Sequence, residues 1–397
     1  MLSYEEALAV VLSSAQSFGQ ETIKLEQALG RVLAEDIFAD RDYPPFNRAS
    51  MDGYAVIAAD FENDIKELLC IRTILAGQIC KEVIKPGECF KIMTGASVPG
   101  SADAVIRIED TALGQLENQV NFNVSDVKKF QNIALKGQDT LANTLVLPKG
   151  TRVTPQVIST LASFGKGKIV VEKLPRVTII STGDEIIGVD EPVSEVTIRN
   201  SNQHVLRAML MAFKIEKIKL KRIKDNKRLL FEKLKKAVSN SDILLMSGGV
   251  SAGDADFVPE ILQELGVVKI FHKINIRPGK PIWFGKKPDG CTVFALPGNP
   301  LSCQTTFKIF VEHFLLKCFG SKPPEMFRFQ MAAQRTKKTN LDEFFPVALY
   351  GTPTQAHQKK FNGSGDITAG LFAEGMAWQR HDKIILEKGD NVDVFLF

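Results

Sequence analysis

Three short apolar runs, each followed at once by a polar loop with glycine, constrain most strongly what this chain can fold into. The runs are Arg176-Val-Thr-Ile-Ile180, Asp242-Ile-Leu-Leu-Met246 and Thr292-Val-Phe-Ala-Leu296. Helical spacing between and around them covers residues 202–213, 226–239 and 257–265. Strands that alternate with helices predict a doubly wound, mostly parallel α/β domain.

The loops after these runs predict one ligand site. They read Ser181-Thr-Gly-Asp-Glu185, Ser247 to Asp256 and Pro297-Gly-Asn-Pro-Leu-Ser302. In open α/β sheets the ligand binds outside the carboxyl ends of the strands. We therefore expect the three loops to converge.

The same loops have the composition of an anion cradle. Glycines in Ser247 to Asp256 let backbone N–H groups approach an anion, and Ser247 and Ser251 add hydroxyl donors. Asn299 and Pro300 resemble an N-cap and first helical position, which would aim a helix over 300–315 at that anion. Arg277-Pro-Gly-Lys-Pro281 adds two cations on a stiff turn. A phosphate or oxyanion is the expected ligand.

Carboxylates in these loops favour Mg²⁺, which takes one or two carboxylates together with phosphate oxygens and waters. They are Asp184, Glu185, Asp254 and Asp256. An esterase is the rival hypothesis, because Gly249-Val-Ser-Ala-Gly253 has the G-x-S-x-G pattern with Ser251 as nucleophile. The chain offers no local signature for the acid and histidine that an esterase needs. It has no Walker A, G-x-G-x-x-G or H-E-x-x-H pattern either.

Elsewhere the pattern predicts helices and small β domains. Ser3 and Glu6 form a capping box that opens a helix over 3–18, and a second short helix is expected at Leu25 to Leu33. Short β-branched runs from Gly53 to about Val127 predict an all-β module. Pro155 opens a helix that ends before Gly165. Short strands after Pro323-Pro324 predict a terminal β-barrel.

Composition excludes several classes of protein. A length of 397 residues predicts more than one domain. Lys and Arg (50) exceed Asp and Glu (46) only slightly, and the lysine-rich run from Lys214 to Lys236 has the spacing of a solvated helix, so no nucleic-acid partner is expected. Six cysteines without a C-x-x-C pair, and no export signal, predict a reducing cytoplasmic setting. No apolar stretch is long enough to predict a membrane span.

Eight segments, in order along the chain, resemble one known family. They are Pro44 to Ala55, Lys91 to Pro99, Ser101 to Val105, Ser181 to Glu185, Asn200 to Asn202, Ser247 to Asp256, Pro278 to Pro281 and Leu296 to Pro300. Over nearly its whole length the chain is similar to the molybdopterin molybdenumtransferases, whose relatives include the C-terminal domain of gephyrin.

The resemblance implies a homodimer of four-part subunits. Residues 1–45 and 140–172 would form a discontinuous N-terminal domain, whose first helix packs on the α/β domain. A β module would cover 46–139, the molybdopterin-binding α/β domain 173–322 and the C-terminal β-barrel 323–397. In such relatives the neighbouring subunit completes the active cleft with motifs that match Met51-Asp-Gly53 and Thr94-Gly95.

The resemblance also implies an activity, insertion of molybdate into adenylylated molybdopterin with Mg²⁺-dependent release of AMP, and a set of site residues. The catalytic positions are Asp52, Thr94, Asp139, Glu185, Asp225 and Asp256, and the last three would hold the metal. The positions expected to bind molybdopterin or molybdate are Ser181, Thr182, Gly183, Ser247, Gly248, Gly249, Ser251, Arg277, Pro278, Lys280, Pro281, Gly298, Asn299, Ser302 and Ser364.

The chain departs from the family pattern in three places. Arg48-Ala-Ser50 inverts the alanine and serine of many relatives. Lys337 to Pro346 lacks the arginines that relatives present there, one of which is expected to contact molybdate, so Lys337 or Lys338 is the expected substitute. Asn362 to Asp366, which carries Ser364, matches a serine-containing loop of the family.

Two other functions stay open on the sequence. Molybdopterin adenylyltransferase, the expected pathway neighbour, has the same type of α/β domain, but the N-terminal half with Met51-Asp-Gly53 favours the transferase. A non-enzymatic scaffold of the gephyrin type is the other. Retention of Asp52, Glu185, Asp256 and Lys280 favours an enzyme.

Overall fold

The computed structural model describes residues 1–124, 126–249, 257–288 and 290–397. The chain forms two compact units. Unit 1 comprises residues 1–35, 149–159 and 167–397, and unit 2 comprises residues 36–148 and 160–166. Each unit has hydrophobic clusters of its own. No helix within these described ranges has both the length and the apolar character needed to cross a bilayer.

A six-stranded sheet with the order β16-β13-β17-β21-β20-β18 forms the centre of unit 1. Strands β16, β13, β17 and β21 are parallel, and β20 and β18 continue the sheet in antiparallel pairs. The strands are β13 (Val177–Thr182), β16 (Ile218–Ile223), β17 (Ile243–Ser247), β18 (Val268–His272), β20 (Trp283–Lys286) and β21 (Thr292–Leu296). The predicted doubly wound, mostly parallel sheet is confirmed.

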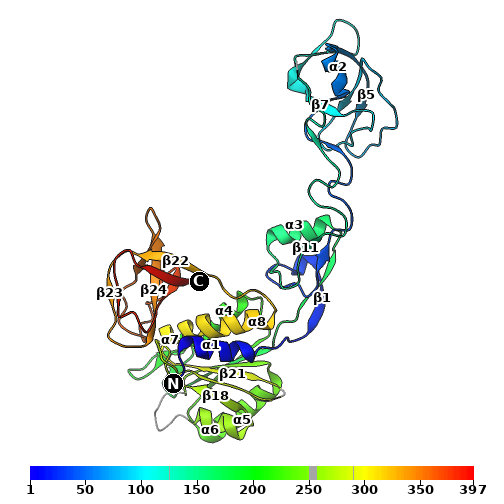
Figure 1. The fold of residues 1–397 in the computed structure, drawn as a ribbon. Helices are drawn as coiled ribbons and strands as arrows, with labels where there is room; N and C mark the ends of the chain where they lie inside the picture. Colours follow the sequence, from blue (N-terminus) through cyan, green and yellow to red (C-terminus); the bar gives the residue numbers. More distant parts are fainter. Residues whose placement is uncertain (125, 250–256, 289) are drawn as a thin grey trace. The chain divides into compact units, whose positions relative to one another are not determined.

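Helices cover both faces of this sheet (Figure 1). On one face lie α1 (Tyr4–Ser13), α4 (Ser201–Met211), α7 (Pro300–Thr306) and α8 (Glu312–Cys318), and on the other lie α5 (Lys227–Asn240) and α6 (Val258–Glu264). Successive strand residues alternate between the two cores. Ile179 and Leu245 pack on the side of α4, and Ile180 and Leu244 pack on the side of α5. The helices predicted over 202–213, 226–239 and 257–265 are confirmed.

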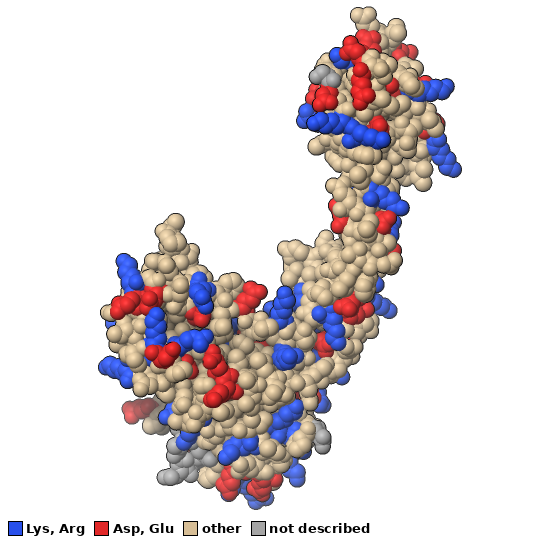
Figure 2. All heavy atoms as spheres, viewed as in Figure 1, with Lys and Arg blue, Asp and Glu red and all other residues tan. Residues whose placement is uncertain are grey.

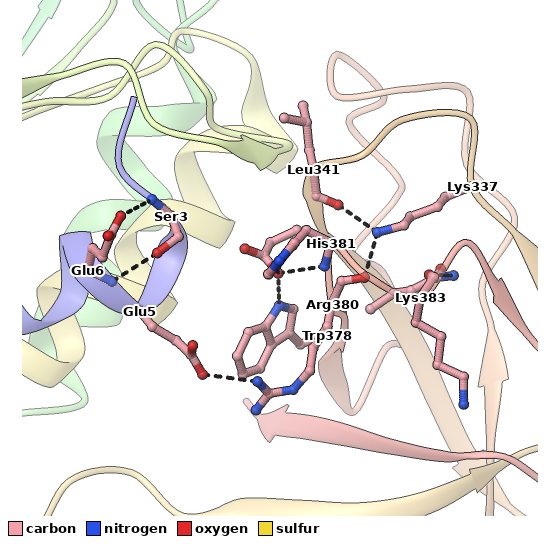
Figure 3. Close-up of polar contacts among 11 residues, drawn as sticks. Ser3, Glu5, Glu6, Lys337, Leu341, Trp378, Arg380, His381 and Lys383 are labelled. Carbon is pink, nitrogen blue, oxygen red and sulfur yellow. Dashed lines mark hydrogen bonds and ion pairs between the residues drawn. The ribbon is translucent and has the colours of Figure 1, made fainter.

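Helix α1 starts as predicted and ends early. The Ser3 hydroxyl accepts from Glu6 N–H at 3.2 Å, and the Glu6 carboxylate accepts from Ser3 N–H at 2.8 Å, which is the predicted capping box (Figure 3). The expected end at residue 18 is wrong, because the helix stops at Ser13. The Ser13 and Ser14 hydroxyls both donate to the Val10 carbonyl, a local alternative to further helical bonds.

The predicted helix from Leu25 to Leu33 is also wrong. Only one 3-10 turn forms, at Leu25–Gln27. It follows β1 (Gln20–Lys24), which pairs antiparallel with β12 (Lys168–Glu172). Gly30 then adopts φ +80°, which breaks a helix, and the next residues pair in extended form. Long-range strand pairing therefore outweighs local helical spacing here.

A closed five-stranded barrel ends the chain, as predicted. Its order is β24-β25-β22-β28-β26, and β26 pairs back with β24. The strands are β22 (Met326–Met331), β24 (Asp342–Tyr350), β25 (Gln355–Gln358), β26 (Gly375–Gln379) and β28 (Asn391–Leu396), with the pair β23 (Arg335–Thr336) and β27 (Ile385–Leu386) beside them. Strand β19 (Ile276–Arg277) joins the barrel through a parallel pairing with β24.

Unit 2 contains the predicted β module. Its sheet has the order β7-β4-β6-β5-β9-β8, and one short helix, α2 (Ala58–Glu62), packs with it. The strands are β4 (Gly53–Val56), β5 (Glu67–Ile74), β6 (Glu88–Ile92), β7 (Ala104–Arg107), β8 (Thr111–Leu113) and β9 (Gln119–Phe122). Smaller pairs are β2 (Ile37–Phe38) with β11 (Leu145–Leu147) and β3 (Arg48–Ala49) with β10 (Ile133–Ala134). Helix α3 (Pro155–Ser163) begins at the proline, as predicted.

Charges of both signs are interspersed over the visible face of each unit (Figure 2). The surplus of four basic residues in the whole chain therefore does not gather into one patch on this face.

Candidate active site

A cavity of about 860 Å³ lies between the α/β loops and the barrel of unit 1. Its α/β wall consists of Gly248, Gly249, Ile276 to Pro281, Pro297, Gly298, Asn299 and Ser302. Its barrel wall consists of Arg335 to Lys338, Leu341, Glu343, Phe344, Phe361, Gly363 and Ser364. Ten of these positions come from the C-terminal barrel region, so the α/β domain alone does not form the cavity.

The strand-end loops lie side by side at one edge of the sheet. Ser181 is in register with Ser247, and Ser247 is in register with Leu296. A Cβ atom on Gly248 would lie 2.7 Å from the Thr182 carbonyl oxygen, so only glycine fits this approach. Gly248 and Gly249 adopt φ values of +91° and +72°, which glycine tolerates best.

Residues of the loops after β17 and β21 line the cavity, whereas Ser181, Thr182 and Gly183 do not. Ser181 and Thr182 are buried. The Ser181 hydroxyl donates to the Asn200 side-chain oxygen at 3.2 Å. Ser251 and Asp256 lie outside the described residues. Ser251 is also the nucleophile of the esterase hypothesis, so the structure does not test that hypothesis.

The turn Arg277-Pro-Gly-Lys-Pro281 supplies cations from the α/β side. Gly279 has φ +110°, and a Cβ atom there would lie 2.5 Å from a Thr306 methyl group. The turn therefore sits tightly against α7. The Arg277 guanidinium lies 3.8 Å from a Glu343 carboxylate oxygen across the cavity wall, and Lys280 is exposed.

Three basic side chains on the barrel wall have different surroundings. Arg335 pairs with Glu343 at 2.8 Å, donates to Gln379 and stacks 4.2 Å from the Phe345 ring centroid. Lys337 is buried and donates to the Leu341 and Arg380 carbonyls at 2.8 and 2.5 Å (Figure 3). Burial lowers the pKa of Lys337 below its ordinary value.

Lys338 is the third, and it is exposed on the cavity wall. No hydrogen bond or ion pair to it is present within the described ranges. The sequence interpretation named Lys337 and Lys338 but missed Arg335, Leu341 and Glu343, which line the same wall. A basic residue two positions before the lysine pair was the available signal for Arg335.

Asn299 stands at the N-cap position of α7, as predicted, but its side chain does not cap the helix. Its amide donates instead to the Ser364 hydroxyl at 2.8 Å. The Ser364 carbonyl accepts from Leu301 N–H at 3.1 Å, so a barrel loop satisfies one of the free donors at this helix end. The expected open helix terminus is therefore partly closed. The helix runs on through a π-helical turn at Phe307–Val311 into α8.

The acidic loops after β13 and β16 are in contact. Asp225 N–H donates to an Asp184 carboxylate oxygen at 3.2 Å. The Glu185 carboxylate folds back over Gly183, within 2.6 Å of where a Cβ atom would stand. No cluster of three metal-binding side chains occurs among the residues that the structure describes. Neither Glu185 nor Asp225 belongs to the cavity wall.

Unit 2 brings two of the predicted catalytic residues together. Thr94 donates from its backbone N–H and from its hydroxyl to the same Asp52 carboxylate oxygen, both at 2.7 Å. These bonds, the backbone one foremost, lower the pKa of Asp52 below its ordinary value. Asp139 is exposed in the same unit, and its N–H donates to the Tyr43 carbonyl at 2.9 Å.

Known proteins are similar to this chain along its whole length. Molybdopterin molybdenumtransferase from Staphylococcus epidermidis is 32% identical over 407 residues, covering 100% of this chain and 95% of that one. The enzyme of the same name from Staphylococcus aureus is 31% identical and covers 99% and 94%. The crystal structure of the molybdopterin biosynthesis MoeA protein from Pyrococcus horikoshii OT3 matches with a TM-score of 0.87 and 30% identity, covering both chains fully.

The fold and the cavity define a class of protein, a multidomain α/β protein whose glycine loops at the strand ends face basic side chains of a C-terminal barrel. Residues 2–165 match the family model described as the MoeA N-terminal region (domain I and II), and residues 178–317 match a probable molybdopterin binding domain. The chain belongs to the MoeA family of molybdopterin molybdenumtransferases.

Proposed function

We propose that this chain inserts molybdate into adenylylated molybdopterin and releases AMP in an Mg²⁺-dependent reaction. As a family member it is a transferase of molybdenum-cofactor biosynthesis. The observation that carries the proposal is the cavity, in which glycine loops suited to phosphate meet cations suited to an oxyanion. Both substrates are anions, so the N–H donors and cations that line the cavity would stabilise both.

Positioning and charge stabilisation are the protein's contribution to this reaction. Gly248 and Gly249 line the cavity, where the glycine loop would receive the phosphates of the adenylyl group. Arg277 and Lys280 offset the charge of molybdate from the α/β side. We place Ser302, which is buried at the start of α7, and Ser364 beside the same anion.

Lys338 takes the place of the family's molybdate-contacting arginine. Arg335 is already neutralised by Glu343, and Lys337 is committed to two backbone carbonyls. Lys338 alone among these three is exposed on the cavity wall. Its ammonium group offers a point charge, whereas an arginine would offer a planar fork with two parallel donors.

Mg²⁺ would be held by Glu185, Asp225 and Asp256. The contact between Asp184 and Asp225 supports this choice for the described residues, because it brings two acidic loops together with oxygen donors of the kind Mg²⁺ takes. When bound, the ion would neutralise charge on the pyrophosphate of the adenylylated substrate.

A homodimer would complete the cleft, with Asp52, Thr94 and Asp139 contributed by the neighbouring subunit. Asp52, Thr94 and Asp139 are exposed in the single chain, which leaves them accessible to a second copy. Molybdopterin adenylyltransferase would supply the substrate. Six free thiols suit a reducing cytoplasmic setting.

The test is AMP release from purified adenylylated molybdopterin with Mg²⁺, with and without molybdate. Molybdate-dependent release that Lys280→Ala slows is the expected result. Lys236→Ala, on the exposed face of α5, is the matched control and should leave the rate unchanged. ATP consumption without molybdate-dependent AMP release would favour adenylylation, and neither activity would favour a scaffold.

A further inference from the structure

We infer that Asn202 is a positioning residue for the anion-binding loops, an inference that rests on the proposed function. Asn202 is the second residue of α4, and its side chain is buried at 8% exposure. One amide nitrogen donates both of its protons into the site. Nδ2 reaches the Ser247 hydroxyl oxygen at 2.7 Å and the Gly298 carbonyl oxygen at 2.6 Å.

These two acceptors belong to different strand-end loops. Ser247 ends β17 and leads into Gly248, whereas Gly298 follows β21. The loops already touch, because a Cβ atom on Gly298 would lie 3.6 Å from the Gly248 Cα atom and Gly248 N–H donates to the Leu296 carbonyl at 3.2 Å. Asn202 therefore fixes the spacing of two loops that line one cavity.

The link continues to the barrel. Gly298 is followed by Asn299, whose amide donates to the Ser364 hydroxyl. A displaced Gly298 would move this contact as well as the backbone beside Gly248. Small displacements matter here, because N–H donors stabilise an anion only within a narrow range of distance and angle.

The side-chain oxygen of Asn202 supports the view that its amide donors are what the site requires at this position. The Asn202 Oδ1 atom is buried and has no hydrogen-bond partner among the described residues. A buried acceptor without a partner is unfavourable for folding, so packing alone does not account for an amide at this position. The two bonds made by Nδ2 are its evident contribution.

Asn202→Asp and Asn202→Ala test this inference. Aspartate keeps the shape but presents an oxygen to the Gly298 carbonyl, and alanine removes both donors without adding charge. Asn240→Asp is the matched control, since Asn240 lies at the exposed end of α5 and its amide donates to the Lys236 carbonyl. Thermal unfolding identifies which variants are folded at the assay temperature, and Asn202→Ala carries the test if Asn202→Asp does not fold.

Two measurements separate positioning from folding. Equilibrium dialysis of adenylylated molybdopterin without molybdate gives its dissociation constant, and AMP release gives KM for each substrate. Both Asn202 variants should raise the dissociation constant and KM for adenylylated molybdopterin on the order of tenfold, with a smaller rise in KM for molybdate, because Ser364 lies further along the link. Asn240→Asp should match the wild type.

Each other outcome overturns the inference. A lower kcat with both KM values unchanged would show loss of active enzyme, which is a structural role. Wild-type binding by both folded Asn202 variants would remove the positioning role and leave the proposed function intact. Absence of binding by the wild-type chain itself would overturn the proposed function, and this inference with it.

Discussion

Arg335 and Glu343 form a buried ion pair within the cavity wall. Their closest atoms, Nη2 and Oε2, are 2.8 Å apart, and the side chains are 9% and 6% exposed. Glu343 also accepts from the Thr339 hydroxyl at 2.8 Å. A basic wall therefore contains one carboxylate that holds a neighbouring arginine in place.

Glu343→Gln should destabilise the fold, because it leaves the Arg335 charge buried and unpaired. We expect the free energy of unfolding to fall by about 3 kcal/mol, measured by urea denaturation. Asp393→Asn is the control, because Asp393 pairs with an exposed Arg328. Loss of that ion pair should lower the free energy of unfolding by less than about 1 kcal/mol. Equal losses in the two variants would contradict the prediction.

Lys338→Ala and Lys337→Ala should fail in different ways. Loss of Lys338 removes one charged contact and should raise KM for molybdate by about tenfold in the AMP-release assay. Loss of Lys337 leaves two carbonyls without their donor and should lower the free energy of unfolding by about 2 kcal/mol. Lys388→Ala, at an exposed barrel position, should do neither. An unchanged KM in Lys338→Ala would refute the assignment of Lys338.

His313 should make the fold sensitive to mild acid. Burial lowers the pKa of His313 from 6.5 to about 4, although its ring nitrogen contacts the Lys308 carbonyl. Because the folded pKa is the lower one, the unfolded chain binds more protons between these values, and stability falls as pH drops from 6.5 to 4. The loss due to this residue should approach about 3 kcal/mol.

The comparison of variants isolates this contribution. The free energy of unfolding of His313→Gln should depend less steeply on pH between 6.5 and 4 than that of the wild type. His204→Gln, at an exposed position of α4, should keep the wild-type slope. The same slope in all three proteins would show that the carboxylates account for the whole acid sensitivity.

Mixed dimers test the shared cleft. Asp52→Ala and Lys280→Ala chains should each release AMP much more slowly than the wild type when expressed alone. If each cleft combines residues of two subunits, a mixed dimer has one doubly altered cleft and one intact cleft. Equal co-expression with random pairing should then restore about one quarter of the wild-type AMP release. Activity no higher than that of the separate variants would place both residues in one subunit's cleft.

Local patterns predicted the parts of the fold in which chemistry and burial agree. Strands β13, β17 and β21 are apolar runs covered on both faces, so their sequences alone identify them. The capping box of α1 was equally visible, because its two bonds join residues three positions apart. The glycine loops could be placed at the strand ends because each of them directly follows one of these apolar runs.

What the sequence missed depends on distant partners. The segment after Leu25 has helical spacing, but β12 and Arg152 draw it into extended pairing. Asn299 has the identity of a capping residue, yet Ser364, a residue of the barrel, takes its amide. The difference between Arg335, Lys337 and Lys338 depends on which carboxylate or carbonyl faces each one. No spacing rule contains that information.

The parallel pairing of β19 with β24 has a mechanical consequence. Ile276 is in register with Asp342, and Arg277 is in register with Glu343, so backbone bonds join the two walls of the cavity along this line. The strand pairing therefore holds the two walls at a fixed distance along this line. A second link between the walls lies at Ser364, where two hydrogen bonds hold the barrel loop to α7 and the loop after β21. The two walls are thus joined by a strand pairing at β19 and by only two hydrogen bonds at Ser364, so a substitution at Ser364 should loosen the barrel loop without breaking the strand pairing.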